Sequence, residues 1–276
     1  MHNTNTILDN VDLNQIESMN YVQFMAFMNE TNRPPGGKGA VRKVAQQVFL
    51  NSDNTVLDVG CNTGFISFEL ARLTKCSVIG VDISTEMIKV ANEHRSEDGE
   101  NRDRVSFCTG DVHHLEYPDK TFDLVISGGS TAFMSKPDEA VKEYKRLVKP
   151  WGFIAELAFF YHEAPPRNLI SRLCNALDID INLWGLNWWR ELFTSIGLEE
   201  YYCEHSPMNI INTEVIEEYA AEMIRPMDYS NKIKEAVNDR LIRLMKLFNE
   251  NHNYLSKAIL IYRSRPIKEQ ITLFGY

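Results

Sequence analysis

Short apolar runs alternate along this chain with segments whose apolar residues recur at helical spacing. Runs of about four to eight aliphatic and β-branched residues between polar or glycine positions are typical of buried strands. The intervening segments, such as Phe65–Leu73, have the period of a helix with one buried face. This alternation predicts an α/β fold. We expect strands at Val56–Val59, Ser77–Asp82, Val105–Thr109, Phe122–Ser127, Phe153–Phe160, Glu200–Glu204 and Ala258–Arg263.

The first predicted strand runs directly into a glycine loop. Gly60 and Gly64 follow Asp58, and a predicted helix begins at Phe65. Glycine lets the backbone turn tightly and lets a ligand approach closely. Asp58 lies at the carboxyl end of its strand, where open α/β sheets bind ligands and where a cationic ligand group would offset the cost of burying a carboxylate. The loop alone is a weak signal, because many such matches are ordinary turns.

Acidic and small residues also follow the next three predicted strands. Asp82 closes the second strand about twenty residues after the loop, which is the spacing of a carboxylate that binds ribose hydroxyls. Ser84 is better suited than Asp82 to cap the next helix. The third and fourth strands are followed by residues that leave room for a ligand, namely Gly110, Asp111, Ser127 and Gly128.

These motifs resemble those of the class I S-adenosylmethionine-dependent methyltransferases, from about Gly36 to Phe160. The resemblance implies a doubly wound, Rossmann-like sheet of seven strands with an antiparallel last strand, and helical lid segments towards both ends. It also implies S-adenosylmethionine as cofactor and S-adenosylhomocysteine as product. Asp82 then binds the ribose and the turn at Gly110 contacts adenine. The implied cofactor site comprises Gly36, Gly37, Asp58, Gly60, Cys61, Asn62, Gly64, Asp82, Ile83, Gly110, Asp111, Val112, Ser127 and Gly128.

Two residues depart from the family pattern. Asn62 stands where the family most often has glycine or another small residue, and Trp151 replaces the first glycine of a pair before the fifth strand. Asparagine tolerates left-handed backbone better than most residues, so we expect the loop to keep its path.

Gly36 and Gly37 form a second predicted ligand turn. Methyltransferases of the phosphoethanolamine type carry a similar turn that contacts the methionine end of the cofactor, together with an upstream tyrosine. By that resemblance Tyr21, on an N-terminal lid helix, is a candidate active-site hydroxyl; the alternative is that it packs on an amphipathic helix. Those enzymes also have a histidine after the fourth strand. This chain has none at Ser130–Met134, so phosphoethanolamine is not supported as the acceptor.

Composition restricts the partners. The chain has 276 residues, enough for one Rossmann-like domain with additions, and a net charge of -9. Because it has no run of lysine and arginine, it lacks the basic surface expected of a protein that binds nucleic acid. The amino terminus shows no basic region followed by an apolar core, so we expect a cytoplasmic protein that does not bind membranes.

Neither cysteines nor histidines indicate a metal site. His113 and His114 are adjacent, so their side chains point apart, and a surface pair is favoured over a zinc site. We expect no metal. The cysteines show no paired spacing and are predicted to be free thiols: Cys61, Cys76, Cys108, Cys174 and Cys203.

We divide the chain into an N-terminal helical cap at residues 1–45 and a methyltransferase core at 46–276. Segments at about 163–187 and 207–253 are insertions, because the minimal core does not require them. The second has apolar residues at helical spacing, which need cover from the core or from a partner. A lid is the favoured interpretation, and a homodimer through the insertions is an alternative. The apolar positions are Ile233, Val237, Leu241, Leu244, Met245 and Phe248.

The acceptor is not marked by a motif. Methyl transfer needs an in-line approach by an O, N, S or C atom, and positioning contributes roughly 7 to 11 kcal/mol, against roughly 3 to 5 for a general base. If the acceptor must lose a proton, His162 is the first candidate base and Tyr21 is another. Aromatic residues expected to shape the acceptor pocket, with core packing as their alternative role, are Phe133, Tyr161, Trp184 and Trp188.

We therefore expect a methyltransferase acting on a small molecule. An NAD(P)-dependent oxidoreductase would share the glycine loop and the ribose acid, but not the turns at Gly36 and Gly110 together with the late strand. A protein that keeps the fold and binds the cofactor or a partner without catalysis is harder to exclude, because the acceptor residues carry no signature.

Overall fold

The computed structural model describes residues 11–28 and 33–266. Their contacts divide the chain into two units, which we call the helical unit (1–30, 163–181 and 207–255) and the sheet unit (31–162, 182–206 and 256–276). Among the described helices, none combines the length and the apolar character needed to cross a membrane.

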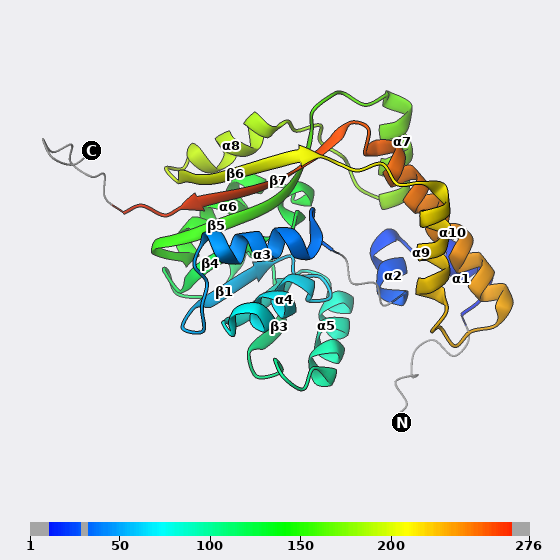
Figure 1. The fold of residues 1–276 in the computed structure, drawn as a ribbon, viewed down its shortest axis with the longest axis horizontal. Coiled ribbons are helices and arrows are strands. Elements are labelled where there is room, and N and C mark those ends of the chain that lie inside the picture. The colour runs from blue at the N-terminus through cyan, green and yellow to red at the C-terminus, as the bar shows by residue number, and fades with distance from the viewer. Residues whose placement is uncertain (1–10, 29–32, 267–276) are drawn as a thin grey trace, which may run out of the picture. The chain divides into compact units, whose positions relative to one another are not determined.

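The sheet unit contains a sheet of seven strands in the order β3-β2-β1-β4-β5-β7-β6 (Figure 1). The strands from β3 to β5 pair in parallel, and the last strand is antiparallel, as the resemblance implied. Near-continuous runs of valine, isoleucine and leucine suit these central strands because both faces of the sheet are covered. The strands are β1 (Thr55–Val59), β2 (Ser77–Asp82), β3 (Val105–Thr109), β4 (Phe122–Ser127), β5 (Val148–Tyr161), β6 (Glu199–Pro207) and β7 (Leu255–Arg263).

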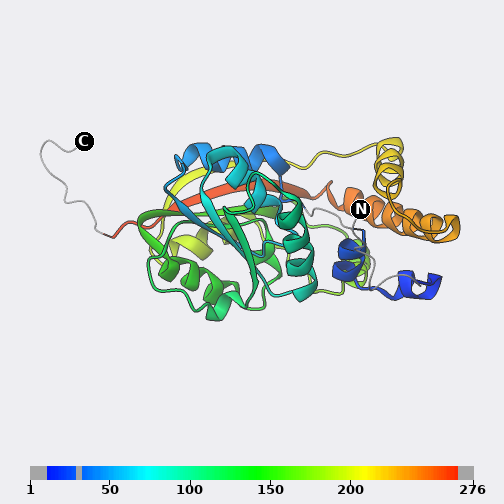
Figure 2. The ribbon, with the colours of Figure 1, turned by 90° about the horizontal axis from the view of Figure 1, so that it is seen from below.

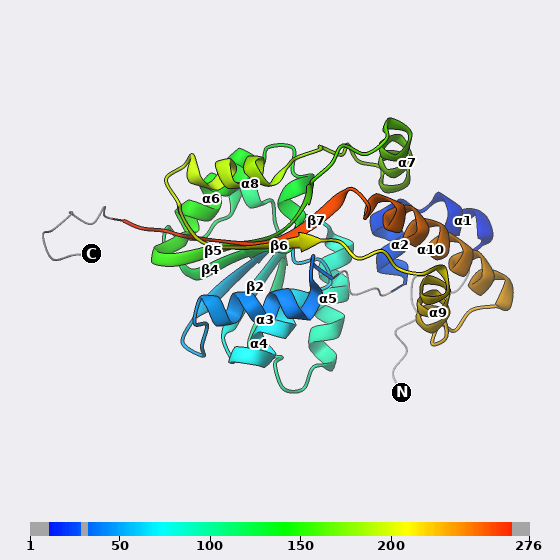
Figure 3. The ribbon, with the colours of Figure 1, turned by 45° about the horizontal axis from the view of Figure 1, so that its top comes forward.

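Helices cover both faces of this sheet. Figure 3 shows α6 (Pro137–Leu147) and α8 (Leu186–Thr194) on one face, and α3 (Gly37–Gln47) and α4 (Phe65–Thr74) on the other. α5 (Thr85–Glu97) packs against β2 and β3. The predicted doubly wound fold is confirmed.

α3 belongs to the sheet unit, although the sequence prediction counted most of it with the N-terminal cap. Val41 and Val44 are fully buried in the apolar layer that α3 and α4 form with the sheet. The burial of these side chains against the strands explains why the helix packs with the core.

The apolar layer under α6 and α8 contains the largest buried side chains. The ring of Phe193 on α8 stacks on Tyr262 of β7, with centroids 4.4 Å apart. Trp189 is fully buried, and its Nε1 donates a hydrogen bond to the carbonyl of Phe159 at 2.9 Å. This bond satisfies the one polar atom of the indole, as burial requires.

Trp151, which stands where the family has a glycine, adopts left-handed backbone with φ of 67°. The guanidinium of Arg263 lies over its ring, 4.8 Å from the centroid. A cation over an indole face is attractive, so this contact offsets part of the backbone strain.

The helical unit is built around α10. α9 packs along it (Figure 2), and α1 and α7 also contact it. The predicted apolar spacing is confirmed as one helix whose buried positions include Ile233, Val237, Leu241 and Leu244. The helices of this unit are α1 (Leu13–Ser18), α2 (Tyr21–Phe27), α7 (Arg167–Leu177), α9 (Thr213–Ile224) and α10 (Asn231–Asn251).

Arg240 of α10 fixes the N-terminal helices within this unit. Its guanidinium donates hydrogen bonds to the carbonyl of Ile16 and, at 2.6 Å, to that of Met19, at the end of α1. It also lies 4.3 Å from the centroid of the Phe24 ring on α2. Since carbonyls at a helix end lack partners within the helix, a cation is favoured there.

Candidate active site

Hydrogen bonds join the carboxyl ends of β1, β2 and β3 at one edge of the sheet. The Gly60 N–H donates to the carbonyl of Val81 at 2.8 Å. The Asn62 N–H donates to Asp82 Oδ2 at 2.9 Å. The Gly110 N–H donates to the carbonyl of Asp82 at 3.0 Å. The loop after β1 and the turn after β3 are therefore both held by the end of β2.

The glycine loop is a cradle that a side chain would fill. Gly60 has φ of +65°, and a Cβ there would lie 2.3 Å from the side chain of Ser130. Gly64 has φ of +93°, and its Cβ would lie 2.7 Å from the Phe107 ring. Asn62 has φ of 52°, which confirms that asparagine keeps the left-handed path of the loop. Only glycine avoids both strain and overlap at Gly60 and Gly64.

Asp58 is fully buried beneath this loop. Its Oδ2 accepts a hydrogen bond from Ser67 Oγ on α4 at 2.6 Å, whereas its Oδ1 has no partner among the described residues. Burial raises the pKa of this carboxyl to about 7 against the hydrogen bond from Ser67, and the nearby Asp82 adds to the rise. A buried carboxylate with an unpartnered oxygen suits a cationic ligand group.

Asp82 ends β2 and is partly exposed. Its Oδ1 accepts from the Ser84 N–H at 2.9 Å, while Ser84 Oγ caps α5 by accepting from Met87, as predicted. Burial raises the pKa of Asp82, and the backbone hydrogen bonds from Ser84 and Asn62 oppose the rise. The adjacent Ile83 is 74% exposed. A carboxylate and an exposed apolar side chain thus stand side by side at the strand end.

Asp111, the predicted adenine contact, accepts hydrogen bonds from the turn that follows it. It caps a short 3-10 helix, η1 (Val112–His114), and its Oδ1 accepts from the His113 N–H at 3.0 Å and from His113 Nδ1 at 2.6 Å. The hydrogen bonds from His113 lower the pKa of Asp111. Nε2 of the same ring lies 3.2 Å from the carbonyl of Lys136. The His113 ring thus bridges Asp111 and Lys136, a contact that no motif in the sequence indicates.

The turn after β4 lies against the Gly36–Gly37 turn. A Cβ on Gly128 would be 3.3 Å from the Pro34 side chain, and Pro34 accepts the Gly37 N–H at 2.8 Å. These contacts bring two predicted parts of the cofactor site together, although they are about ninety residues apart in the chain.

Beneath the turn after β4 lies a buried polar cluster that the sequence did not reveal. Glu156 of β5 is fully buried and accepts hydrogen bonds from Ser127 Oγ at 3.1 Å and Thr131 Oγ1 at 2.7 Å. Thr131 Oγ1 also lies 3.0 Å from the hydroxyl of Tyr144 on α6. Burial raises the pKa of Glu156 to about 8, with the two hydroxyl bonds opposing the rise.

The predicted acceptor aromatics have different environments. Phe133 is 60% exposed at the end of η2 (Ser130–Phe133). Trp184 and Trp188 stack with centroids 3.6 Å apart and are partly buried against the core, which favours their packing role. Tyr161 is half-buried and its N–H donates to the carbonyl of Trp184 at 2.9 Å.

The two candidate bases belong to different units. His162 is exposed after β5, with Nδ1 at 2.9 Å from Ser256 Oγ. If Nδ1 carries the proton, Nε2 is left to accept one from an acceptor. Tyr21 lies on α2 in the helical unit, where its ring meets Phe248 edge to face with centroids 5.9 Å apart. This contact matches the packing alternative for Tyr21.

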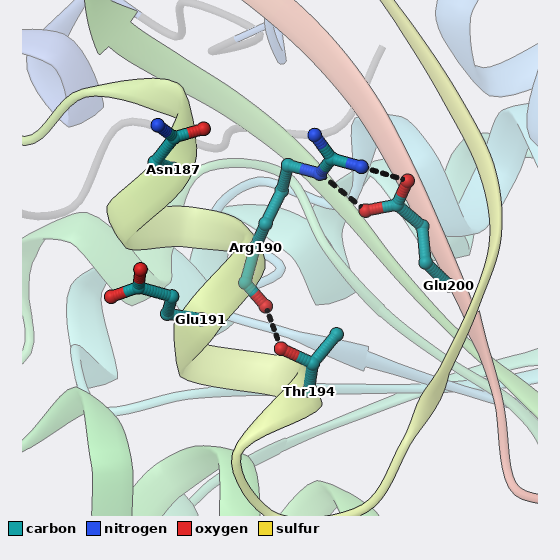
Figure 4. A pocket seen from close by; sticks show the side chains of 5 residues that line it. All are labelled: Asn187, Arg190, Glu191, Thr194 and Glu200. Carbon is teal, nitrogen blue, oxygen red and sulfur yellow. Dashed lines mark hydrogen bonds and ion pairs between the residues drawn. The ribbon is translucent and has the colours of Figure 1, made fainter.

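A surface pocket elsewhere in the sheet unit contains none of the predicted site residues. Figure 4 shows Arg190 of α8 paired with Glu200 of β6, at 2.6 and 2.7 Å. The lining residues are Asn187, Arg190, Glu191, Thr194 and Glu200. The described residues also contain no group of three or more side chains suited to a metal ion, and all five cysteines are free thiols.

The fold and this edge define the class of protein. A sheet in this strand order, with a glycine loop after β1 and an acid at the end of β2, is the arrangement that the sequence motifs implied. The glycine cradle and the unpartnered oxygen of Asp58 fit S-adenosylmethionine, which carries cationic groups. The fold is thus that of the Rossmann-like, S-adenosylmethionine-dependent methyltransferases.

Comparisons with known proteins identify the family. A family profile described as "Methyltransferase domain" matches residues 50–188, half of the chain, and the chain belongs to this family. Methyltransferase GfsG of Streptomyces halstedii is 32% identical over 119 residues, which are 43% of this chain and 42% of that protein. The chain therefore matches less than half the length of this relative. Family membership removes the oxidoreductase alternative.

Two solved structures share the fold. The MccD protein has a TM-score of 0.71 and 24% identity, with 84% of this chain and 99% of that chain covered. Phosphoethanolamine N-methyltransferase 2 of Haemonchus contortus, solved with phosphomonomethylethanolamine and S-adenosylhomocysteine, has a TM-score of 0.66 and 17% identity. The match covers 88% of this chain and 57% of that one.

Proposed function

We propose that this protein transfers the methyl group of S-adenosylmethionine to an O, N, S or C atom of a small-molecule acceptor. The observation that carries the proposal is the joined edge of β1, β2 and β3, where the buried Asp58 keeps one oxygen without a partner among the described residues. Burying a carboxylate without a partner costs free energy, which a cationic ligand would offset. Membership of the methyltransferase family indicates that this ligand is S-adenosylmethionine.

Different residues at the sheet edge would bind the methionine, ribose and adenine parts of the cofactor. Asp58, with the turn at Gly36 and Gly37, would bind its methionine end. Asp82 would bind the ribose hydroxyls through an oxygen that now accepts a backbone N–H. The adenine would lie by the exposed Ile83. The remaining proposed contacts are Gly60, Cys61, Asn62, Gly64, Gly110, Asp111, Val112, Ser127 and Gly128.

When bound, the cofactor supplies a methyl group on a positively charged sulfur. The protein's part is to hold acceptor and methyl in line and to exclude water, which accounts for roughly 7 to 11 kcal/mol in well-oriented systems. Phe133, exposed beside the turn after β4, is our first acceptor contact. We propose His162 as the base for acceptors that must lose a proton, and Tyr21 as a second candidate.

Calorimetry with S-adenosylhomocysteine tests the binding part of the proposal. We expect it to bind and NADH not to bind. A protein that binds neither would support a scaffold with the fold alone. The Glu139→Gln variant, changed at an exposed position of α6, should bind S-adenosylhomocysteine as the wild type does.

Incubation with methyl-labelled cofactor and a metabolite extract tests the catalytic part. A labelled product identifies the acceptor and the atom methylated. Binding of S-adenosylhomocysteine without any labelled product from extracts of several sources would favour the non-catalytic alternative.

Several sequence predictions stay predictions. They are the cytoplasmic location, the absence of nucleic-acid and membrane partners, the homodimer through the helical insertions and the lid role of those insertions.

A further inference from the structure

Glu156 is an acid inside the apolar part of β5, Phe153–Phe160. It is fully buried on β5, where it pairs in register with Ser127, the last residue of β4. Its neighbours in the strand, Ala155 and Leu157, are buried apolar residues on the opposite face. A leucine would pack at such a position without the cost of removing a carboxyl group from water.

The hydrogen bonds of Glu156 go to a single segment. Oε1 accepts from Ser127 Oγ and Oε2 accepts from Thr131 Oγ1. Ser127 and Thr131 bracket the turn after β4, and Thr131 is itself fully buried. Burial raises the pKa of Glu156 to about 8, and the hydrogen bonds from this turn oppose the rise.

Ser130, in the turn between Ser127 and Thr131, contacts the glycine loop and the end of β1. Ser130 Oγ donates to the carbonyl of Val59 at 2.8 Å and lies 3.1 Å from Ser127 Oγ. Ser130 also occupies the space beside Gly60 that a Cβ would need. A shift of the turn would therefore move its contact with the loop that leads into the cofactor site.

The same turn begins η2, which carries the exposed Phe133. Glu156 thus lies beneath a segment that has the glycine loop on one side and a proposed acceptor contact on the other. Both carboxyl oxygens of Glu156 already accept hydrogen bonds from this segment, so neither is left to bind a ligand.

We propose that Glu156 is a positioning residue, which fixes the turn at Ser127–Thr131 against the glycine loop and so sets the affinity for S-adenosylmethionine. The inference rests on the proposed function. It predicts that hydrogen bonding at this position matters for ligand affinity, beyond its effect on stability.

Three variants of the full chain test it. Glu156→Gln keeps the shape and the hydrogen-bonding capacity, and Glu156→Leu keeps only the approximate volume. Ile154→Ala is the matched control, because Ile154 is buried in the apolar layer under α6 and α8 and has no polar atom in its side chain. Thermal unfolding first establishes that each variant is folded and by how much it is destabilised.

S-Adenosylhomocysteine affinity and amide hydrogen exchange are then measured. Glu156→Leu should bind about tenfold more weakly, since two hydrogen bonds that position the turn are lost. Glu156→Gln should stay within about threefold and Ile154→Ala within about twofold of the wild type. The rate of amide hydrogen exchange at residues 129–131 should increase more in Glu156→Leu than in Ile154→Ala.

Two outcomes overturn only this inference: Glu156→Leu binds as tightly as the wild type, or Ile154→Ala loses as much affinity as Glu156→Leu. A wild-type protein that binds no S-adenosylhomocysteine overturns the proposed function, and this inference with it.

Discussion

Replacing Glu156 by glutamine should change how stability depends on pH. The pKa of this carboxyl is raised from 4.5 to about 8 by burial. The folded state therefore holds the proton more tightly than the unfolded state, so the contribution is fully present below about pH 4.5 and is lost as the pH rises through about 8. The loss is about 1.4 kcal/mol per pH unit, or about 5 kcal/mol over the whole interval.

Glutamine has no proton to lose, so the variant should gain on the wild type as the pH rises. Between about pH 5.5 and 7.5 the difference in the free energy of unfolding should shift in favour of the variant by roughly 2 to 3 kcal/mol. Asp58, whose pKa is about 7, titrates in both proteins and cancels in the difference.

Urea unfolding followed by tryptophan fluorescence is the assay. All four tryptophans lie in the sheet unit, so the signal reports on the unit that contains Glu156. The exposed-site variant Glu139→Gln serves as control and should follow the wild type at each pH. A difference between Glu156→Gln and the wild type that stays constant with pH would show that Glu156 is not buried as a neutral acid.

Three further changes give distinct expectations. Asp82→Ala should weaken S-adenosylhomocysteine binding about ten- to a hundredfold by calorimetry, through loss of charged hydrogen bonds to ribose; unchanged affinity would refute the ribose role. Gly60→Ala should cost about 1 to 3 kcal/mol of stability in urea because of its positive φ and its overlap with Ser130, whereas Gly99→Ala, with open space around it, should cost much less. Arg240→Met should speed amide exchange in α1 without changing exchange in β1; protection kept in α1 would contradict its role at that helix end.

Most of the fold could be predicted because each strand of the sheet centre is a local apolar run. The errors lie where pairing depends on distant partners. β5 begins at Val148, five residues before the expected start, although Lys149 and Pro150 do not suggest a strand. Val148 is in register with Phe122 of β4, with a register shift before Leu124, so a partner strand determines this end of β5.

The site was predictable where one short segment contains the signal. The loop around Gly60 and the acid Asp82 are local motifs, and the structure joins them by hydrogen bonds. The cluster around Glu156 draws on β4, η2 and α6 as well as β5, so no spacing along the chain encodes it. Its one local sign is a glutamate within an apolar strand.

Asp58 and Glu156 are both fully buried acids on central strands, but their hydrogen bonding separates their roles. Both oxygens of Glu156 accept bonds from the protein. Asp58 Oδ1 has no partner among the described residues, so a ligand is left to supply one. An ammonium group at that oxygen would stabilise the charged carboxylate and lower its pKa from about 7.

Binding should therefore release a proton. At about pH 6 a carboxyl with a pKa of about 7 is roughly nine-tenths protonated. S-Adenosylhomocysteine has an ammonium group at its methionine end, so we expect it to displace most of one proton at that pH and about a tenth of one at about pH 8. Calorimetry in two buffers of different ionisation enthalpy measures this number. Asp58→Asn should release none, and a wild-type protein that binds at pH 6 without releasing a proton would place the ammonium group away from Asp58.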